Sequence, residues 1–172
     1  MNKPDPELRP DHQLAVREAA ERLARQPALA IVDSAYPDGK PAVLFVCVHN
    51  AGRSQMALGF FQHLAGDRAV AWSGGSEPGS AVNPTAVAAM AERGIDISTE
   101  YPKPWTDAVV RAADVVVSMG CGDSCPVFPG KRYVTWELDD PAGQELEAVR
   151  PIRDEIERRV RALLRDLGVA VA

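Results

Sequence analysis

The sequence has little of what membrane proteins and nucleic-acid-binding proteins have in abundance. No apolar stretch approaches the length of a membrane span, because charged residues interrupt every candidate. The 172 residues include 19 Lys and Arg against 24 Asp and Glu, a net charge of -5, so no surplus of basic residues exists to neutralise a nucleic-acid backbone or an anionic lipid surface. We expect neither a membrane nor a nucleic acid as partner, and any bound anion must be held locally.

Cysteine is also scarce. Cys47, Cys121 and Cys125 make an odd total, which favours catalytic, redox-active or buried thiols in a reducing compartment over a disulfide framework. The start of the sequence, MNKPDPELRPDHQ, lacks the apolar core and cleavage site of a secretory signal. Both absences predict a cytoplasmic protein. The chain also lacks a second cysteine pair or a well-spaced histidine pair, so we expect no metal site.

What is present is an ordinary globular composition, 46% hydrophobic and 25% charged, in a chain of one-domain length. Residues 1–40 indicate a helical N-terminal extension, because a proline-rich start leads into a helix candidate with an apolar stripe at 11–26. Beyond it, apolar runs alternate with helical periods, which is typical of β-α-β units. We expect an α/β domain at 41–172. Its predicted strands are 42–47, 69–73, 113–118 and 132–136.

Apolar spacing and end signals predict three helices in this domain. The first follows Arg53, and the second begins at Asn83 and Pro84, a capping residue before a proline, and stops near Gly94. The third lies near the C-terminus with Pro151 in its first turn. Its expected apolar face consists of Ile152, Ile156, Val160, Leu163 and Leu167.

The segment CVHNAGRS, residues 47–54, concentrates groups that can hold an anion. Cys47 lies at the carboxyl end of the first strand, just before a helix, where open parallel sheets bind ligands. The five residues between Cys47 and Arg53 can curl so that their N–H groups point at an oxyanion, and the same dipoles favour a nucleophilic thiolate. Arg53 can grip two oxygens of a tetrahedral anion, and Ser54 can hydrogen-bond the thiolate. The expected oxyanion-binding residues are Val48, His49, Asn50, Ala51, Gly52, Arg53 and Ser54.

Taken alone, these residues also fit a buried cysteine at a strand end and a surface arginine at a helix start. The longer segment VLFVCVHNAGRSQMA resembles the signature of the low-molecular-weight protein tyrosine phosphatase superfamily, and its RSQMA ending is similar to the arsenate reductases of that superfamily. The similarity continues through SGGSEPGSAVNPTAVAAMAERGIDIS to WELDDPAGQ. The resemblance implies a four-stranded parallel sheet flanked by helices, with Cys47 as nucleophile.

Asp140 is the general acid that this resemblance implies, because Asp139-Asp140-Pro141 matches the aspartate-proline loop of the family. A carboxylic acid near the leaving oxygen can protonate it as the thiolate attacks. Taken alone, an acidic pair before proline also fits a solvated turn. The tyrosines typical of the phosphatases after this loop are absent, since Ala142 and Gly143 follow, and this favours arsenate reduction over phosphate ester hydrolysis.

The loop MGCGDSCPVFPG, residues 119–130, supplies two further thiols. Considered alone, they also fit a structural pair or half of a zinc site. The arsenate reductases that are coupled to thioredoxin resemble this arrangement, which implies that Cys121 attacks the Cys47 sulfur after arsenate has bound there, and that Cys125 then attacks Cys121. The remaining disulfide needs an external reductant, either thioredoxin or a mycothiol or glutaredoxin-like system. The short Cys121–Cys125 spacing leaves the geometry of this relay open.

A potassium ion lies beside the anion loop in some arsenate reductases of this type, on an acidic residue at the position of Leu58. Asn50 and Ser73 match other members of that cation site. The leucine argues against potassium dependence, and we expect Asn50 to brace the loop instead.

The sequence therefore predicts an arsenate reductase for arsenic detoxification that binds no cofactor. A phosphomonoester hydrolase is the alternative enzyme, and a non-catalytic module that senses redox state or arsenic through its thiols is the alternative of another class. The apolar stripe in residues 1–40 suggests a homodimer. The expected catalytic residues are Cys47, Arg53, Cys121, Cys125 and Asp140.

Overall fold

Strand β1 (Ala42–Cys47) lies inside a four-stranded parallel sheet of order β2-β1-β3-β4 in the computed structural model, which describes residues 18, 40–120 and 128–171. β2 (Val70–Gly75) and β3 (Val115–Ser118) flank β1, and β4 (Arg132–Thr135) pairs with β3. All six residues of β1 are buried, as expected for a strand covered on both faces. The predicted α/β fold is confirmed, and each strand lies within two residues of its predicted bounds.

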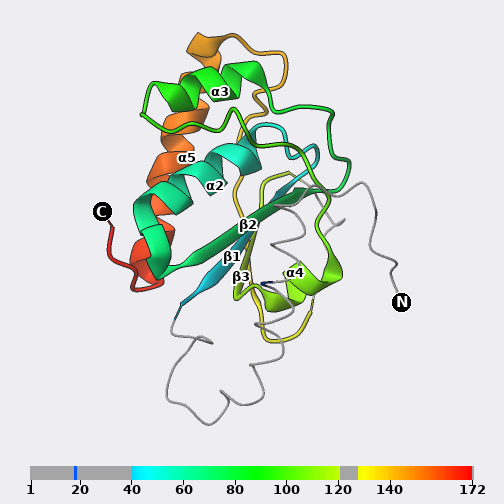
Figure 1. Ribbon diagram of the computed structural model, residues 1–172, viewed down its shortest axis with the longest axis vertical. Coiled ribbons are helices and arrows are strands. Elements are labelled where there is room, and N and C mark those ends of the chain that lie inside the picture. The colour runs from blue at the N-terminus through cyan, green and yellow to red at the C-terminus, as the bar shows by residue number, and fades with distance from the viewer. Residues whose placement is uncertain (1–17, 19–39, 121–127, 172) are drawn as a thin grey trace.

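Helices cover the two faces of this sheet unequally. Figure 1 shows α2, α3 and α5 on one side of the sheet and α4 on the other. Alternate residues of β1 accordingly enter two apolar clusters: Phe45 and Cys47 pack in the cluster of α2, α3 and α5, whereas Leu44 and Val46 pack in that of α4. The bounds are α2 (Arg53–Ala65), the 3-10 helix η2 (Gly66–Arg68), α3 (Pro84–Ala91), α4 (Asp107–Ala112) and α5 (Leu146–Asp166).

The start of α3 follows from its sequence. The side chain of Asn83 accepts a hydrogen bond of 2.9 Å from the N–H of Thr85, and Pro84 occupies the first helical position, as predicted. The helix ends at Ala91, and Gly94 lies just beyond it with φ of +72°. The predicted cap and stop are confirmed.

The start of α5 differs from the prediction. The helix begins at Leu146, so Pro151 lies in its second turn instead of its first. Proline has no N–H to donate to the carbonyl of Glu147, and this costs the helix one hydrogen bond. The earlier start buries Val149 completely on the apolar face that Ile152 continues, which offsets that loss. The expected apolar residues from Ile152 to Leu167 are buried.

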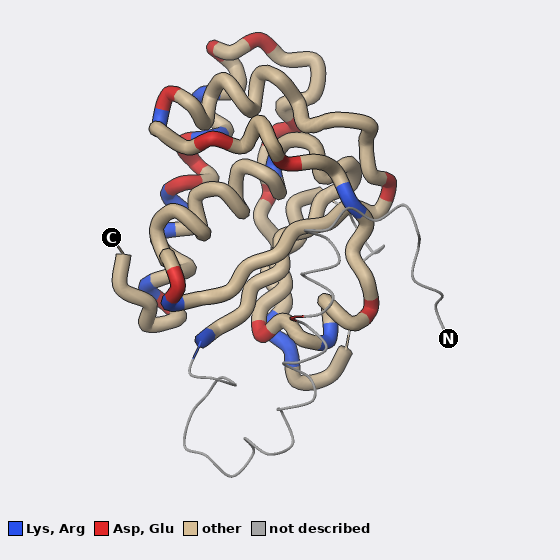
Figure 2. The backbone as a smooth tube through the Cα atoms, viewed as in Figure 1, with Lys and Arg blue, Asp and Glu red and all other residues tan. Residues whose placement is uncertain are grey.

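Ion pairs join α3 to α5. The carboxylate of Glu92, at the end of α3, accepts hydrogen bonds from Arg150 at 2.8 Å and from Arg153 at 2.6 Å. These two bonds lower the pKa of Glu92 from 4.5 to about 2. Figure 2 shows basic and acidic positions interleaved along α5.

Apart from Lys40 at its end, Glu18 is the one described residue of the predicted N-terminal extension. It is helical, and its Oε2 accepts a hydrogen bond of 3.4 Å from the indole N–H of Trp72 in β2. The remainder of the predicted helix at 11–26 lies outside the described residues, so the division at residue 40 stays a prediction. None of the helices in the described part of the chain is long and apolar enough to cross a membrane.

Candidate active site

Cys47 ends β1 and Arg53 begins α2, so the predicted anion loop lies between a strand end and a helix start. Gly52 is the N-cap of α2; among the described residues, no side chain caps the first N–H groups and none in the first turn is acidic. The positive end of the helix dipole therefore faces the loop without a side chain that competes with an anion.

The carbonyl groups of the loop are turned away from this site. The oxygens of Val48, His49 and Ala51 accept hydrogen bonds of 2.8 to 2.9 Å from the backbone N–H groups of Glu77, Gly79 and Asn83. Because the C=O and the following N–H of a planar trans peptide point in opposite directions, the N–H groups after these carbonyls point inward. One of them, the N–H of Asn50, lies 3.3 Å from Cys47 Sγ. A loop with this arrangement of N–H groups can hold an anion.

The side chain of Ser54 contacts the sulfur of Cys47, and the side chain of Asn50 holds Ser54 in turn. Ser54 Oγ lies 2.9 Å from Cys47 Sγ, and the side-chain amide of Asn50 donates a 2.6 Å hydrogen bond to the same Oγ. Because the Ser54 oxygen accepts this hydrogen bond from Asn50, the Ser54 hydroxyl proton is free to be donated to the sulfur. All three side chains are buried, so this polar cluster around the sulfur is shielded from solvent.

Asn50 has an unusual backbone conformation, with φ of +50°. Asn50 Oδ1 accepts hydrogen bonds of 3.1 Å from the N–H of Lys103 and from Gln55 Nε2. Gln55 Nε2 also donates a 3.1 Å hydrogen bond to the backbone carbonyl oxygen of Asn50. Such left-handed residues are kept in place by their surroundings and are common where a loop must bind a ligand. Asn50 therefore braces the loop, as the sequence suggested.

Arg53 and Asp140 face one another across a small cavity. Arg53 Nη2 lies 3.7 Å from Asp140 Oδ2, and the arginine side chain is 11% exposed whereas the aspartate is 54% exposed. The cavity holds about 60 Å³, several times the roughly 15 Å³ that one water molecule needs, which suits a small tetrahedral anion. Its lining residues are Cys47, His49, Ala51, Gly52, Arg53, Asn83, Asp140, Pro141 and Ala142.

The aspartate-proline loop closes tightly over the anion loop. A methyl group at Gly52 would lie 2.7 Å from Pro141 Cγ, so a larger residue there would push this loop away. Asp140 Oδ1 accepts a 3.0 Å hydrogen bond from the N–H of Ala142, which orients its carboxylate. Asp139 is exposed and does not line the cavity, whereas Asp140 does.

Cys121 and Cys125 lie outside the described residues. The chain that leads to them is described up to Gly120, which follows β3 and has φ of +102°. A methyl group at Gly120 would lie 2.7 Å from Arg53 Nη1, so the backbone passes directly against the guanidinium group one residue before Cys121. Of the predicted catalytic residues, the structure thus brings Cys47, Arg53 and Asp140 together.

Sequence reasoning missed Gln55 and Lys103, which hold the loop from behind. Gln55 had a detectable signal, because it is a polar residue among the apolar residues that α2 buries. Lys103 gave no signal, since a lysine in a loop is ordinarily exposed. His49, one of the expected oxyanion-binding residues, has its Nδ1 2.9 Å from the carbonyl oxygen of Glu77 at the protein surface.

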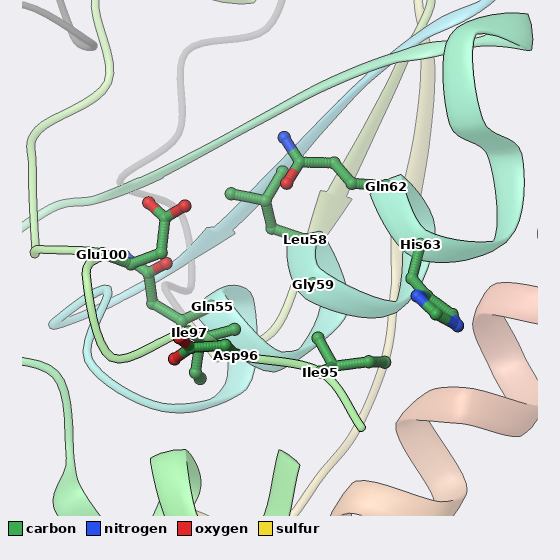
Figure 3. A pocket seen from close by; sticks show the side chains of 9 residues that line it. All are labelled: Gln55, Leu58, Gly59, Gln62, His63, Ile95, Asp96, Ile97 and Glu100. Atoms are coloured by element: carbon green, nitrogen blue, oxygen red, sulfur yellow. The ribbon is translucent and has the colours of Figure 1, made fainter. Parts of the chain in front are cut away.

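A second and larger cavity of about 280 Å³ lies beside α2. In the view of Figure 3, Leu58 lies between the amide of Gln62 and the carboxylate of Glu100. Neither Cys47 nor Arg53 lines this cavity, so it lacks the nucleophile and the anion-binding group of the smaller one. Within residues 40–120 and 128–171, no group of three His, Cys, Asp or Glu side chains could hold a metal ion.

A family model described as low molecular weight phosphotyrosine protein phosphatase matches residues 42–171. The chain belongs to this family. Among its relatives is a putative arsenate reductase of Halobacterium salinarum, 40% identical over 121 residues, which cover 67% of this chain and 85% of the relative. A glutaredoxin arsenate reductase of Synechocystis sp. is 41% identical over 125 residues, covering 71% and 95% of the two chains.

Solved structures of this family agree with the fold. The thioredoxin-dependent arsenate reductase of Corynebacterium glutamicum superposes on this chain with a TM-score of 0.71 at 39% identity. The superposition covers 88% of this chain and 71% of the Corynebacterium chain. A low-molecular-weight protein tyrosine phosphatase from T. tengcongensis gives a TM-score of 0.66 at 27% identity, with 74% and 99% of the chains covered. The superposition with the arsenate reductase thus covers a larger part of this chain than the superposition with the phosphatase does.

Proposed function

We propose that this chain is an arsenate reductase that converts arsenate to arsenite for arsenic detoxification, with Cys47 as nucleophile. The contacts of Cys47 Sγ with Ser54 Oγ at 2.9 Å and with the N–H of Asn50 at 3.3 Å carry this proposal. They hold a nucleophilic sulfur at the edge of a cavity of the size of a tetrahedral oxyanion, and relatives at 40% and 41% identity are named arsenate reductases.

In the first step, the Cys47 thiolate attacks the arsenic atom of arsenate, an S–As bond forms, and an oxygen leaves as water. The loop N–H groups and Arg53 hold the remaining oxygens. Asp140, which lines the same cavity, supplies the proton that the leaving oxygen needs.

In the second step, the Cys121 thiolate attacks Cys47 Sγ. The S–As bond breaks, its electron pair stays on arsenic, and arsenite leaves as a Cys47–Cys121 disulfide forms. Cys125 then attacks Cys121 and returns Cys47 as a thiolate. The two electrons that reduce the arsenic therefore come from the two thiols that end as the Cys121–Cys125 disulfide. The contact of Gly120 with Arg53 supports this assignment, because it places the chain beside the oxyanion cavity one residue before Cys121.

The reductant of that disulfide is an external thiol, and we propose thioredoxin. A disulfide between two cysteines of one loop is the kind of substrate that a dithiol protein resolves by exchange. The Corynebacterium structure is that of a thioredoxin-dependent enzyme, whereas the Synechocystis relative is named for glutaredoxin. A glutaredoxin or mycothiol route would use Cys47 as the one cysteine of this chain, together with an external small thiol.

Arsenite formation from arsenate, coupled to thioredoxin, thioredoxin reductase and NADPH, tests the proposal. We expect turnover by the wild type and none by Cys47→Ser or Cys121→Ser. Cys125→Ser keeps the first two steps, so it should release one arsenite per chain and stop as a Cys47–Cys121 disulfide that mass spectrometry detects. This variant is the internal control for an intact anion loop.

Other results would select another function or route. Turnover by Cys121→Ser and Cys125→Ser with glutaredoxin or mycothiol would replace the relay by the small-thiol route. Hydrolysis of p-nitrophenyl phosphate without any arsenite formation would make the chain a phosphatase. Arsenite binding in a fixed ratio without turnover would indicate a sensing module.

We further propose a cytoplasmic location, where thiols stay reduced, and a helical extension at residues 1–40. The contact of Glu18 with Trp72 supports an extension that packs on β2 of the same chain. The homodimer expected from its apolar stripe is a separate prediction, which sedimentation of the full chain at several concentrations tests. A single monomeric species at all concentrations would contradict it.

A further inference from the structure

Lys103 is buried although it carries an ammonium group. Lys103 is 8% exposed, and its Nζ donates hydrogen bonds to Ser73 Oγ at 3.2 Å and to the carbonyl oxygen of Tyr101 at 3.5 Å. The ring of Tyr101 lies 5.4 Å from the same nitrogen. Burial of a lysine is costly unless oxygens or a π face solvate the ammonium group, as they do here. A buried cation with its own set of oxygen acceptors thus lies beside the anion loop.

The backbone of Lys103 connects this cation to the loop. Its N–H donates a 3.1 Å hydrogen bond to Asn50 Oδ1, and its carbonyl oxygen accepts one of 2.9 Å from Gly75. Gly75 in turn supports the loop, because a methyl group there would lie 2.6 Å from the carbonyl oxygen of Val48. Lys103 is therefore fixed at its side chain, its N–H and its carbonyl, and two of these attachments lead to the anion loop.

The contacts continue without a break to the nucleophile. Asn50 receives the Lys103 N–H on its side-chain oxygen and donates its side-chain amide to Ser54, which contacts Cys47 Sγ. The carbonyl of Tyr101 accepts hydrogen bonds from both Lys103 Nζ and Gln55 Nε2, and Gln55 also holds the backbone of Asn50. Loss of the ammonium would leave the acceptors on Ser73 and Tyr101 without this donor and release the segment that keeps Asn50 at positive φ.

We propose that the Lys103 ammonium is a built-in cation that holds the anion loop in its binding conformation, so that oxyanion affinity and thiolate reactivity depend on Lys103 and not on an added monovalent cation. Lys103 is a positioning residue: it acts through Asn50 and Ser54 and does not touch the bound anion. The inference rests on the proposed role of Cys47 and the loop, but its readouts require no arsenate turnover.

The test uses the full chain with Cys121→Ser and Cys125→Ser, in which Cys47 is the remaining thiol. Iodoacetamide alkylation of Cys47 is followed against pH, with and without inorganic phosphate as the protecting oxyanion. Lys103→Met removes the charge and keeps the length of the side chain. Lys40→Met removes the same charge at an exposed position and is the matched control. The other titratable groups that line the cavity with Cys47 are His49, Arg53 and Asp140, and they are unchanged in both variants.

We expect Lys103→Met to need at least about tenfold more phosphate for half-protection and to alkylate at a different rate across the pH range, because the loop around Cys47 loses its support. Lys40→Met should match the parent within twofold. Lys103→Ala leaves a space at the position of the ammonium group. In this variant, ammonium chloride or potassium chloride should restore part of the protection by phosphate, whereas sodium chloride should not. The parent protein should show no such response.

Phosphate protection in Lys103→Met within twofold of the parent would overturn the inference, and so would a parent protein that requires added potassium or ammonium. If Lys103→Met does not fold, Ser73→Ala removes one acceptor of the ammonium and should weaken protection about threefold, and an unchanged value would equally overturn the inference. If the three-cysteine protein makes no arsenite while Lys103→Met loses protection, the proposed function fails and the role of Lys103 stands.

Discussion

Gly120 lies directly against Arg53, so closely that a methyl group on its Cα would be 2.7 Å from Nη1. The contact joins the end of β3 to the group that is proposed to grip the oxyanion. Because Gly120 also has φ of +102°, both its conformation and the space around it favour glycine.

Gly120→Ala should therefore displace the Arg53 guanidinium and lower kcat/KM for arsenate by about tenfold, which corresponds to about 1.4 kcal/mol of lost transition-state stabilisation. Gly130→Ala is the matched control, because Gly130 also has positive φ but has open space around its Cα. Both variants should lose a similar stability of about 1 kcal/mol in urea unfolding, since each puts a side chain at positive φ. Equal kcat/KM values for the two would show that the contact with Arg53 has no role.

Ser54→Ala should slow the reaction of Cys47 at neutral pH. The variant removes the hydroxyl that lies 2.9 Å from Sγ, and hydrogen bonds to charged groups contribute about 1.5 to 3 kcal/mol. We expect iodoacetamide alkylation and arsenate turnover to fall by about tenfold or more, while Ser80→Ala, at an exposed position, stays at the wild-type rate. Wild-type alkylation by Ser54→Ala would mean that the loop N–H groups alone support the thiolate.

Asp140→Asn should lower kcat by about a hundredfold and change KM little, because a general acid contributes to the step and not to binding. Removal of the carboxylate also takes a partner from Arg53, so a small gain in oxyanion affinity should accompany the loss of rate. Asp139→Asn is the matched control, one residue away and outside the cavity. Equal losses of kcat in the two variants would contradict the assignment of Asp140.

Stability at low pH should report the Glu92 ion pairs. Its pKa is lowered from 4.5 to about 2 by Arg150 and Arg153, so its stabilising effect is fully present above pH 4.5 and disappears as the pH falls toward 2. Glu92→Gln should melt below the wild type at pH 7, and the gap should close between pH 4.5 and pH 2. Glu137→Gln, an exposed control, should show no gap. A Glu92→Gln gap that is constant with pH would exclude this linkage.

Local sequence was enough to predict the strand, the loop and the helix around Cys47. The apolar run before Cys47, the glycine at 52 and the helical spacing after Arg53 are adjacent in the chain, and each depends on its neighbours in the sequence. The cap at Asn83 was predictable for the same reason, because its hydrogen bond reaches two residues along the chain.

The support of the loop could not be predicted, because it comes from distant parts of the chain. Lys103 reaches Asn50 across 53 residues and Ser73 across 30, and only the packing of these segments makes its burial favourable. The start of α5 was missed since Pro151 is a common first-turn residue, whereas here the burial of Val149 in the apolar cluster of α2, α3 and α5 outweighs one missing helical hydrogen bond.

The register between β1 and β3 has a consequence for how this chemistry can change. Val46 pairs with Ser118, so the two strands end side by side, one delivering the nucleophile and the other the segment that begins with Gly120. Under the proposed relay, the part that recognises the oxyanion and the part that supplies electrons are thus carried by separate segments that follow neighbouring strands. Replacement of residues 121–127 alone could exchange one electron donor for another, or abolish reduction, and leave anion recognition as it is.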